Sequence, residues 1–424
     1  KMRLNVLIAG QAGQGLDKTS DILCNAIVAH GLYVFNYREY QSQITGGTSF
    51  NVICIADKPV NSFDLSFDVA IFFDENKIKE FVNHLKQKAI VVFPTKFDET
   101  EFNELKKAKK EKKLKSFGID IDAEIKKRGW NKIVKNTILL GIFSGIVGLD
   151  GKIFHLVIEK EIKKYLKDNI EAFDFGYRTG SEIRKSSDVE IELKKTNNNI
   201  LYFKGNEAVA HMLTKSGIEF YLAYPMTPST GLLNEMAKKV FTWQPESEIA
   251  VINAALGIAA AGKKVAIGSS GGGFALMVEG LSFAGMAELP IVIYLASRHG
   301  PSTGAPTYTS QADLKFAVNA GHGNFAKIVF ALSTIKNAML TVANAVYVAY
   351  KYRMPVILLS DKHFAESGFS IEESELKKIE RYAIKISKEI NIKKSEDKRE
   401  NKSEIVKTYP LDNPFSPLPT MGEE

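Results

Sequence analysis

Four clusters of small, hydroxyl-bearing and charged residues follow apolar runs in the second half of the chain. They are YPMTPST at 224–230, QPESE at 244–248, GSSGGG at 268–273 and SRHGPSTGAPT at 297–307. In open α/β sheets, ligands bind beyond the carboxyl ends of the strands. If the apolar runs are strands of one sheet, these clusters lie at its ligand-binding edge, where we expect the chemistry.

The first and last clusters offer groups that could bind a carboxylate. Pro225 and Pro228 stiffen the first loop, so the hydroxyl groups of Thr227 and Ser229 are presented at little ordering cost. Arg298 follows the apolar run PIVIYLAS, and its guanidinium is suited to bidentate binding of a carboxylate. A proline-rich turn and a solvated surface arginine are the alternative interpretations.

Glu248 opens an alanine- and glycine-rich apolar helical pattern, EIAVINAALGIAAAG. Burial disfavours the charged form of a carboxylate, which suits a group that shares a proton with a cofactor nitrogen. Equally, Glu246 or Glu248 could be an acid that is stabilised by the dipole at a helix N-terminus. The sequence leaves these two interpretations even.

A separate glycine loop, IAGQAGQGLDKTS, lies near the start of the chain between an apolar run and a helical pattern. Such a loop can cradle a phosphate with backbone N–H groups. Its spacing matches neither a P-loop nor the dinucleotide pattern, although Glu39 could serve as a ribose-binding acid. We favour a tight strand-to-helix turn, and a nicotinamide-dependent dehydrogenase is the alternative.

Composition excludes several classes of protein. The 424 residues are 45% hydrophobic and 25% charged, which is typical of a globular protein of roughly two or three domains. The net charge of +7 comes from mixed-sign, lysine-rich stretches such as ELKKAKKEKKLK, which favour an exposed helix or loop over a nucleic-acid surface. The longest apolar stretch, 137–149, is too short to span a membrane.

Cysteine and histidine usage gives no metal site in this chain. Cys24 and Cys54 are the only cysteines, so there is no disulfide framework and no ligand set for zinc or an iron–sulfur cluster. The seven histidines have no metal-ligand spacing. We expect a reducing compartment and a cytoplasmic location.

The apolar runs divide the chain into two α/β regions. LNVLIAG, YVFNY, FNVICIA, DVAIFF and AIVVFP indicate βαβ units on a mainly parallel sheet, and IEFYLAYP, KVAIGS, PIVIYLAS, AKIVFAL and MPVILLS indicate a second such sheet. We predict a Rossmann-like domain at 1–182, a linker at 183–200, a second α/β domain at 201–370, and a charged, proline-rich linker at 371–424.

In their order and spacing, the four clusters resemble those of the α subunit of 2-oxoacid:ferredoxin oxidoreductases. YPMTPST is similar to the family's YPITPS loop, ESEIAVINAALGIAAAG to its glutamate-bearing helix, and SRHGPSTGAPTYTSQADL to its R-G-G-P-S-T-G segment. The first region resembles the family's γ domain through GQAGQG, QSQITGGTSFN, NTILLGIFSGIVGL and AFDFGY. The order is that of the fused γ–α subunit of the 2-oxoglutarate type.

The resemblance implies an enzyme subunit that is active only with a separate β subunit. The family oxidatively decarboxylates a 2-oxoacid on thiamine diphosphate, forms an acyl-CoA from coenzyme A, and reduces ferredoxin. The second domain would be the pyrimidine-binding half of the cofactor site, while the β subunit would supply the Mg²⁺ site and a 4Fe-4S cluster. An αβ or (αβ)2 hetero-oligomer in anaerobic metabolism is implied. Use of 2-oxoglutarate is favoured, and pyruvate or broad 2-oxoacid use is the alternative.

The resemblance also assigns roles to individual residues. Glu248 would hydrogen-bond the pyrimidine N1′ and act as the catalytic residue. Tyr224 and Pro225 would border the aminopyrimidine, while Thr227 and Arg298 would contact the substrate carboxylate. A non-catalytic assembly module is a further alternative, because the family normally continues into another α-subunit domain that we expect to be absent here.

The sequence departs from the family pattern at a few positions. His299 replaces a glycine that is usual in the family, Gly272 stands where a proline is usual, and Thr45 replaces an arginine often found in the first domain. Gln11 and Ala12 alter the first glycine loop. These departures spare the residues assigned to the cofactor and the substrate carboxylate.

Overall fold

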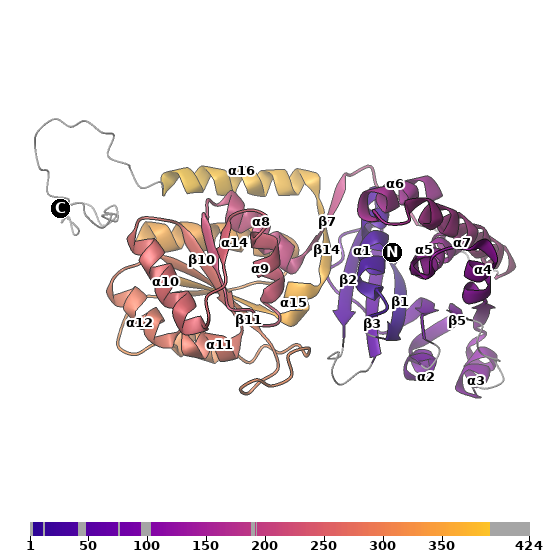
Figure 1. Ribbon diagram of the computed structural model, residues 1–424, viewed down its shortest axis with the longest axis horizontal. Helices are drawn as coiled ribbons and strands as arrows, with labels where there is room; N and C mark the ends of the chain where they lie inside the picture. The colour runs from indigo at the N-terminus through magenta and orange to yellow at the C-terminus, as the bar shows by residue number, and fades with distance from the viewer. Residues whose placement is uncertain are drawn as a thin grey trace, which may run out of the picture. The chain divides into compact units, whose positions relative to one another are not determined.

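The computed structural model describes residues 3–11, 13–40, 48–74, 77–94, 103–187, 191 and 193–390 (Figure 1). The chain divides into two compact units. The first comprises residues 1–203 and 367–373, and the second comprises residues 204–366 and 374–424. The chain therefore leaves the first unit, builds most of the second, and returns to the first for a short segment.

The first unit contains an eight-stranded sheet in the order β6-β5-β4-β1-β3-β2-β14-β7. Its strands are β1 (Arg3–Gln11), β2 (Tyr33–Glu39), β3 (Thr48–Ala56), β4 (Phe67–Phe72), β5 (Leu85–Pro94), β6 (Lys115–Ile119), β7 (Ile200–Lys204) and β14 (Gly368–Glu372). Strands β1, β4, β5 and β6 pair in parallel, but β3 is antiparallel to both β1 and β2. Residues 40–47 join β2 to β3, and a parallel pair needs a crossover of about a dozen residues. On one side of β1 the strands β4, β5 and β6 are parallel, whereas on the other side β3, β2 and β14 pair antiparallel, unlike the mainly parallel sheet expected for this domain.

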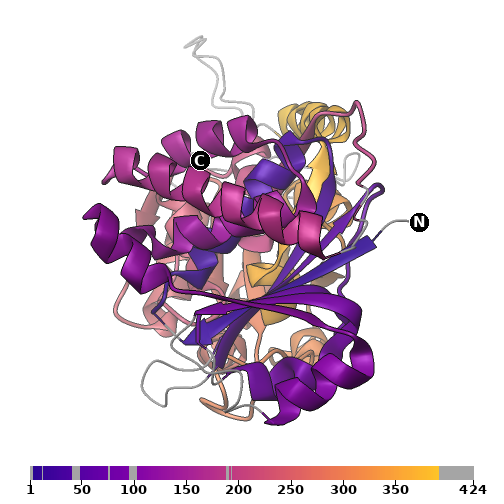
Figure 2. The same cartoon turned by 90° about the vertical axis from the view of Figure 1, so that its right-hand side faces the viewer.

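One face of this sheet is covered by α1 (Leu16–Ala29), α4 (Ile121–Arg128), α5 (Lys135–Val147), α6 (Gly151–Glu161) and α7 (Leu166–Ser186). On the other face, Phe81 of the short helix α2 (Ile78–Phe81) packs against Phe67 and Phe72 of β4, and α3 (Asn103–Lys112) contacts α2 (Figure 2). The 3-10 turns are Val82–His84 and Lys132–Val134. Helices α5 and α7 pack closely through glycines. A Cβ atom at Gly180 would lie 2.0 Å from the Ile142 carbonyl oxygen, so no larger residue fits there.

The second unit contains a six-stranded sheet in which every neighbouring pair is parallel, in the order β12-β13-β11-β10-β8-β9. Its strands are β8 (Phe220–Leu222), β9 (Phe241–Trp243), β10 (Val265–Ser269), β11 (Ile291–Ser297), β12 (Ile328–Ala331) and β13 (Pro355–Asp361). The carboxyl ends of all six strands meet at one edge, because parallel neighbours point the same way. The mainly parallel sheet predicted for the second domain is confirmed.

Helices cover both faces of the second sheet (Figure 1). One layer is formed by α10 (Glu248–Ala260), α11 (Gly271–Leu276), α12 (Val278–Met286) and α13 (Leu314–Asn319), and the other by α8 (Gly205–Lys215), α14 (Ile335–Tyr352) and α16 (Glu373–Glu389). The short helices α9 (Thr230–Met236) and α15 (Lys362–Glu366) follow strands β8 and β13. In the part of the chain that the structure describes, no helix is both long enough and apolar enough to cross a membrane.

The ends of the expected domains differ from the observed elements. Helix α7 continues to Ser186, and the stretch expected to be a linker after residue 370 contains helix α16. Four apolar residues at helical spacing are buried on α16: Leu376, Ile379, Ala383 and Ile386. Residues 391–424, and the departures at Ala12 and Thr45, lie outside the described residues.

Candidate functional site

Glu248 is the first residue of α10, and its side chain is buried, with 3% of its surface exposed. Ser247 caps the helix by accepting a hydrogen bond from the Ala250 backbone N–H. The Glu248 carboxylate accepts a hydrogen bond of 3.5 Å from the hydroxyl of Ser269, the last residue of β10. Glu246 is exposed. The burial of Glu248 thus distinguishes two acids that the sequence left equivalent.

Gly273 makes room for this carboxylate. A Cβ atom at Gly273 would lie 2.3 Å from Glu248 Oε1 and 2.1 Å from Ser269 Oγ, distances that real Cβ contacts do not reach. The glycine-rich cluster after β10 therefore has a packing function beside Glu248. The sequence marked that cluster as a loop of interest but gave no reason for its last glycine, Gly273.

Arg298 and Thr227 come together at the carboxyl ends of β11 and β8. The guanidinium donates from Nη1 to the Thr227 carbonyl oxygen at 3.0 Å and from Nη2 to the Thr303 carbonyl oxygen at 3.1 Å. Burial lowers the pKa of Arg298, but the guanidinium stays charged because the ordinary pKa of arginine is so high. It is therefore the backbone of Thr227 that contacts Arg298.

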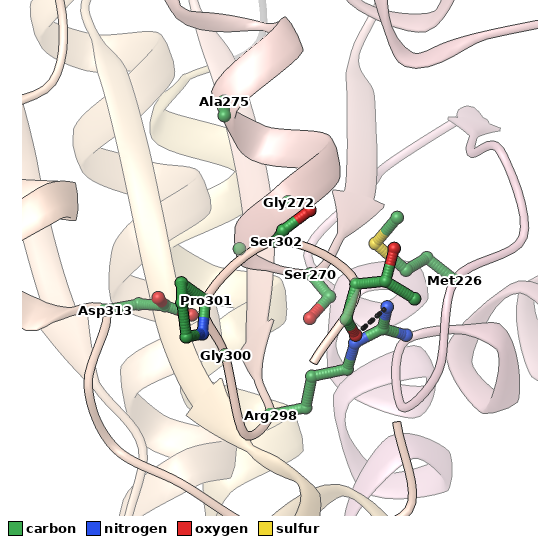
Figure 3. Close-up of a pocket in the computed structure, with 11 residues that line it drawn as sticks. Met226, Ser270, Gly272, Ala275, Arg298, Gly300, Pro301, Ser302 and Asp313 are labelled. Atoms are coloured by element: carbon green, nitrogen blue, oxygen red, sulfur yellow. Dashed lines mark hydrogen bonds between the residues drawn. The ribbon is translucent and has the colours of Figure 1, made fainter. Parts of the chain in front are cut away.

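A cavity of about 480 Å³ lies beside these residues (Figure 3). Its walls are Met226 after β8, residues 270–272 after β10, Arg298 with residues 300–303 after β11, and Asp313. Three strand ends thus contribute to one hollow, as expected at the carboxyl edge of a parallel sheet.

Two buried polar atoms in this cavity have no hydrogen-bond partner in the structure. They are Ser270 Oγ and Asp313 Oδ2. Buried polar atoms are nearly always hydrogen-bonded, so such a pair marks a place where a bound molecule would supply the missing partner. Neither residue was singled out from the sequence, although Ser270 lies in the 268–273 cluster and Asp313 in the segment SRHGPSTGAPTYTSQADL.

The other sequence-predicted residues take less central positions. Tyr224 and Pro225 are exposed and do not line the cavity, whereas their neighbour Met226 does. Glu248 is also absent from the lining, but it contacts Ser269, which directly precedes Ser270 in the wall. Among the described residues, no group of three or more His, Cys, Asp and Glu side chains is arranged to hold a metal ion.

The described residues of the first glycine loop line a smaller hollow of about 280 Å³. Gly13 and Gly15 have positive φ angles of 87° and 74°, which glycine adopts without strain. Arg38, in the wall of this hollow, forms an ion pair of 2.7 Å with Asp17. Glu39, the last residue of β2, lines the same hollow as Gly13 and Gly15. The strand order still differs from a dinucleotide fold, because β3 lies between β1 and β2.

Two family models match most of the chain between them. Residues 5–179 match the model described as pyruvate ferredoxin/flavodoxin oxidoreductase. Residues 211–414 match the model described as pyruvate flavodoxin/ferredoxin oxidoreductase, thiamine diphosphate-binding. The second match includes every cluster that builds the cavity.

Individual relatives agree with these matches. The chain is 31% identical over 421 residues to the 2-oxoacid:ferredoxin oxidoreductase subunit alpha of Saccharolobus solfataricus, covering 86% of this chain and 66% of the relative. It is 31% identical over 457 residues to 2-oxoacid:ferredoxin oxidoreductase 1, subunit alpha, of Sulfurisphaera tokodaii, covering 93% and 71%. The 2-oxoglutarate synthase subunit KorA of Archaeoglobus fulgidus is 36% identical over 184 residues, covering 42% and 53%.

A solved structure shares the fold over most of the chain. The 2-oxoglutarate:ferredoxin oxidoreductase from Magnetococcus marinus, solved with 2-oxoglutarate, coenzyme A and succinyl-CoA bound, matches with a TM-score of 0.79 and 28% identity. The match covers 88% of this chain and 66% of that one. The chain therefore spans about two thirds of the length of these larger relatives.

Proposed function

The chain belongs to the α subunits of 2-oxoacid:ferredoxin oxidoreductases, and from this premise we propose that it is the fused γ–α subunit of such an enzyme. The complete enzyme converts a 2-oxoacid and coenzyme A to an acyl-CoA and CO2 and reduces ferredoxin. The observation that carries the proposal is the convergence of Glu248, Thr227 and Arg298. They follow three strands, β9, β8 and β11, whose carboxyl ends meet at one edge of a parallel sheet.

The residues at this edge fit the pyrimidine half of thiamine diphosphate. A buried carboxylate, a glycine that leaves it room, and the unpartnered hydroxyl of Ser270 suit a flat ring that carries both hydrogen-bond donors and acceptors. When bound, the cofactor supplies a carbon nucleophile for the keto carbon and an acceptor for the electrons released with CO2. Mg²⁺ and a 4Fe-4S cluster would be held by the β subunit.

Glu248 would hold a proton against the pyrimidine N1′. Its burial keeps water away from the carboxyl, so the proton is shared with the cofactor nitrogen and not with solvent. Ser247 caps the helix that begins at Glu248, so the Glu248 carboxylate is not used as the helix cap. Tyr224 and Pro225 would border the ring from the loop after β8.

Arg298 would bind the carboxylate of the 2-oxoacid beside Thr227. A guanidinium has five N–H donors, and its hydrogen bonds to the carbonyl oxygens of Thr227 and Thr303 use only two of them. Those two bonds fix the plane of the guanidinium, so the remaining donors are already oriented for a carboxylate. Oriented binding of this kind lowers the entropic cost of bringing substrate and cofactor together.

A β subunit would cover exposed apolar side chains beside this edge. Helices α10 and α11 contact each other and expose Ile249 (53% exposed) and Leu276 (51%). Clustered exposed apolar residues are typical of a surface that binds another protein. The first of them directly follows Glu248, so this partner would also close the catalytic edge.

The substrate that we favour is 2-oxoglutarate. The support is the set of KorA relatives, which are 2-oxoglutarate synthase subunits, and the structural neighbour that was solved with 2-oxoglutarate. Pyruvate and broad 2-oxoacid use are the alternatives that the test below separates.

The test is anaerobic reduction of methyl viologen by the chain mixed with a candidate β subunit, thiamine diphosphate, Mg²⁺ and coenzyme A. We expect turnover only in the mixture, faster with 2-oxoglutarate than with pyruvate. The chain alone and the β subunit alone are the controls. A stable complex without turnover of either acid would contradict the proposal and favour a non-catalytic assembly module.

A further inference from the structure

The loop that carries Arg298 is anchored at its far end to the neighbouring strand. It runs from 298 to 313, and near its end Gln311 Nε2 donates a hydrogen bond of 2.6 Å to Asp361 Oδ2. Thr309 Oγ1 also accepts a hydrogen bond of 3.2 Å from the His363 backbone N–H. Asp361 is the last residue of β13, and it pairs in register with Ser297, which directly precedes Arg298. The loop therefore returns to a point one strand away from its origin.

Asp361 is the fixed partner in this anchor. Its side chain is 8% exposed, and its second oxygen, Oδ1, accepts a hydrogen bond of 2.7 Å from the Phe364 backbone N–H in α15. Both carboxylate oxygens are thus occupied, and the carboxylate cannot rotate without losing a bond. Gln311 is exposed on the loop, so the anchor joins an exposed loop to a buried and rigid acid.

Hydrogen bonds inside the loop transmit this constraint to Arg298. The His299 N–H donates to the Tyr308 carbonyl oxygen at 3.0 Å, and the Ala305 N–H donates to the His299 carbonyl oxygen at 2.9 Å. Arg298 itself holds the loop through the Thr303 carbonyl oxygen at 3.1 Å. The residues that follow Arg298 are therefore hydrogen-bonded to residues that shortly precede the anchor.

We propose that Gln311 and Asp361 are positioning residues for the 2-oxoacid carboxylate, because they hold the 298–313 loop in the form that orients Arg298. This inference rests on the proposed function and adds to it two residues that lie outside the cofactor and substrate contacts. Release of the anchor loosens the loop and weakens substrate binding. It leaves Glu248, and with it the chemical step on bound substrate, in place.

The anchor is tested by exchanging its hydrogen-bond donor and acceptor. Gln311→Glu places two carboxylates in contact, and their repulsion opens the anchor. In the double variant Gln311→Glu with Asp361→Asn, the new asparagine donates to the new glutamate and still accepts from the Phe364 N–H, so the anchor is rebuilt with donor and acceptor exchanged. Asp361→Asn alone is the folding control, because Gln311 can turn its amide to offer an oxygen.

The first readout is hydrogen exchange in the isolated full-length chain, which does not depend on activity. We expect the loop amides of His299, Ala305 and Tyr308 to exchange about tenfold faster or more in Gln311→Glu, because a hydrogen bond to a charged group is lost. Exchange in the double variant returns close to that of the wild type. Unchanged loop exchange in Gln311→Glu would overturn the anchor.

The second readout is steady-state kinetics of the chain assembled with its β subunit. We expect the KM for the 2-oxoacid to rise about tenfold in Gln311→Glu, with kcat within about twofold of the wild type, and the double variant to restore KM. Faster loop exchange with an unchanged KM would reduce the anchor to a purely structural contact and overturn the positioning role. A wild-type assembly that turns over no 2-oxoacid would contradict the proposed function, while the exchange measurement would still stand as a test of the anchor.

Discussion

Glu246 and Glu248 stand two residues apart and have opposite surroundings, which gives the catalytic assignment a matched control. Glu246 is exposed, whereas Glu248 is buried beside Ser269. We expect Glu248→Gln to lower the kcat of the assembled enzyme by about a hundredfold or more, because an amide cannot hold the shared proton. Methyl viologen reduction at saturating thiamine diphosphate measures this loss.

Glu246→Gln is expected to stay within about twofold of the wild type in the same assay, since exposed substitutions away from special features have small effects. Equal losses in the two variants would show that the difference in burial has no catalytic meaning. Full activity of Glu248→Gln would remove Glu248 from the mechanism.

Gly273 and Gly272 form a second matched pair. A Cβ atom at Gly273 would collide with Ser269 Oγ and Glu248 Oε1, whereas at Gly272 the nearest atom, the Ser302 carbonyl oxygen, is 3.6 Å away. We expect Gly273→Ala to destabilise the chain by about 1–3 kcal/mol through overpacking. Gly272→Ala should be neutral or stabilise the chain by up to about 1 kcal/mol, because alanine favours a helix over glycine.

Thermal unfolding of the isolated chain, followed by circular dichroism, measures both variants. Thiamine diphosphate titration of the assembled Gly273→Ala enzyme should also show weaker binding than the Gly272→Ala enzyme. Identical melting curves for the two variants would mean that the carboxylate beside Gly273 moves away at no cost.

At the scale of whole elements, His30 joins two helices of the first unit. It ends α1, where Nδ1 lies 2.6 Å from the Ala26 carbonyl oxygen, and its Nε2 accepts a hydrogen bond of 2.8 Å from the N–H of Asp150, the residue that caps α6. The ring is therefore neutral, with its proton on Nδ1. Burial lowers the pKa of His30 below its ordinary value of 6.5.

This direction fixes the pH dependence of stability. Above pH 6.5, His30 is neutral in both the folded and the unfolded chain, so its contribution to the free energy of unfolding is complete. Below pH 6.5, the unfolded chain binds a proton at His30 more readily than the folded chain does, and the free energy of unfolding falls. We expect the apparent Tm of the wild type to fall more steeply than that of His30→Gln between about pH 6.5 and about pH 5. Parallel curves for the two proteins would contradict the assignment.

Most elements could be predicted from the sequence because their apolar runs are long. Strands β1, β10, β11 and β13 were predicted within a residue or two, since strands that are buried on both faces are continuously apolar. Strand β7 was not predicted as part of the first sheet, because most of its residues are only half-buried and its partner β14 lies far along the chain. Pairing between such distant segments is set by the tertiary fold and leaves no local pattern.

The candidate site, like the fold, could be predicted from the sequence only in part. Residue type and order along the chain made Thr227, Glu248 and Arg298 candidates, but only the family resemblance preferred Glu248 to Glu246. The roles of Ser270, Asp313 and the Gln311–Asp361 anchor depend on which strands are neighbours and in which register. A hydrogen bond between residues 50 positions apart is visible only once β11 and β13 are paired.

At the scale of the whole molecule, β14 follows most of the second unit along the chain but belongs to the first unit. The effect of this arrangement on stability can be tested at Phe369. It lies on β14, is 3% exposed and contacts Phe35 of β2 edge to face at 5.2 Å between ring centroids. We expect Phe369→Ala to destabilise the first unit by about 3–5 kcal/mol, as for other buried phenylalanines. Hydrogen exchange should accelerate in peptides from β2.

Phe364, five residues earlier, provides the control, because it is equally buried but packs beside Gly205 in the second unit. Phe364→Ala should accelerate exchange in peptides from α8 and leave β2 unchanged. If Phe369→Ala instead loosened α8, the assignment of β14 to the first unit would be wrong.

The return of β14 to the first sheet also sets an order of events during synthesis. When residue 203 leaves the ribosome, the strand that separates β2 from β7 has not yet been made, because it is encoded more than 160 residues later. Until then β2 presents an open edge, which is a template for pairing with other chains. Translation of the second unit therefore fixes how long the nascent first sheet stays exposed to aggregation, and slowing the ribosome within residues 204–366 should lower the yield of native protein more than slowing it after residue 373.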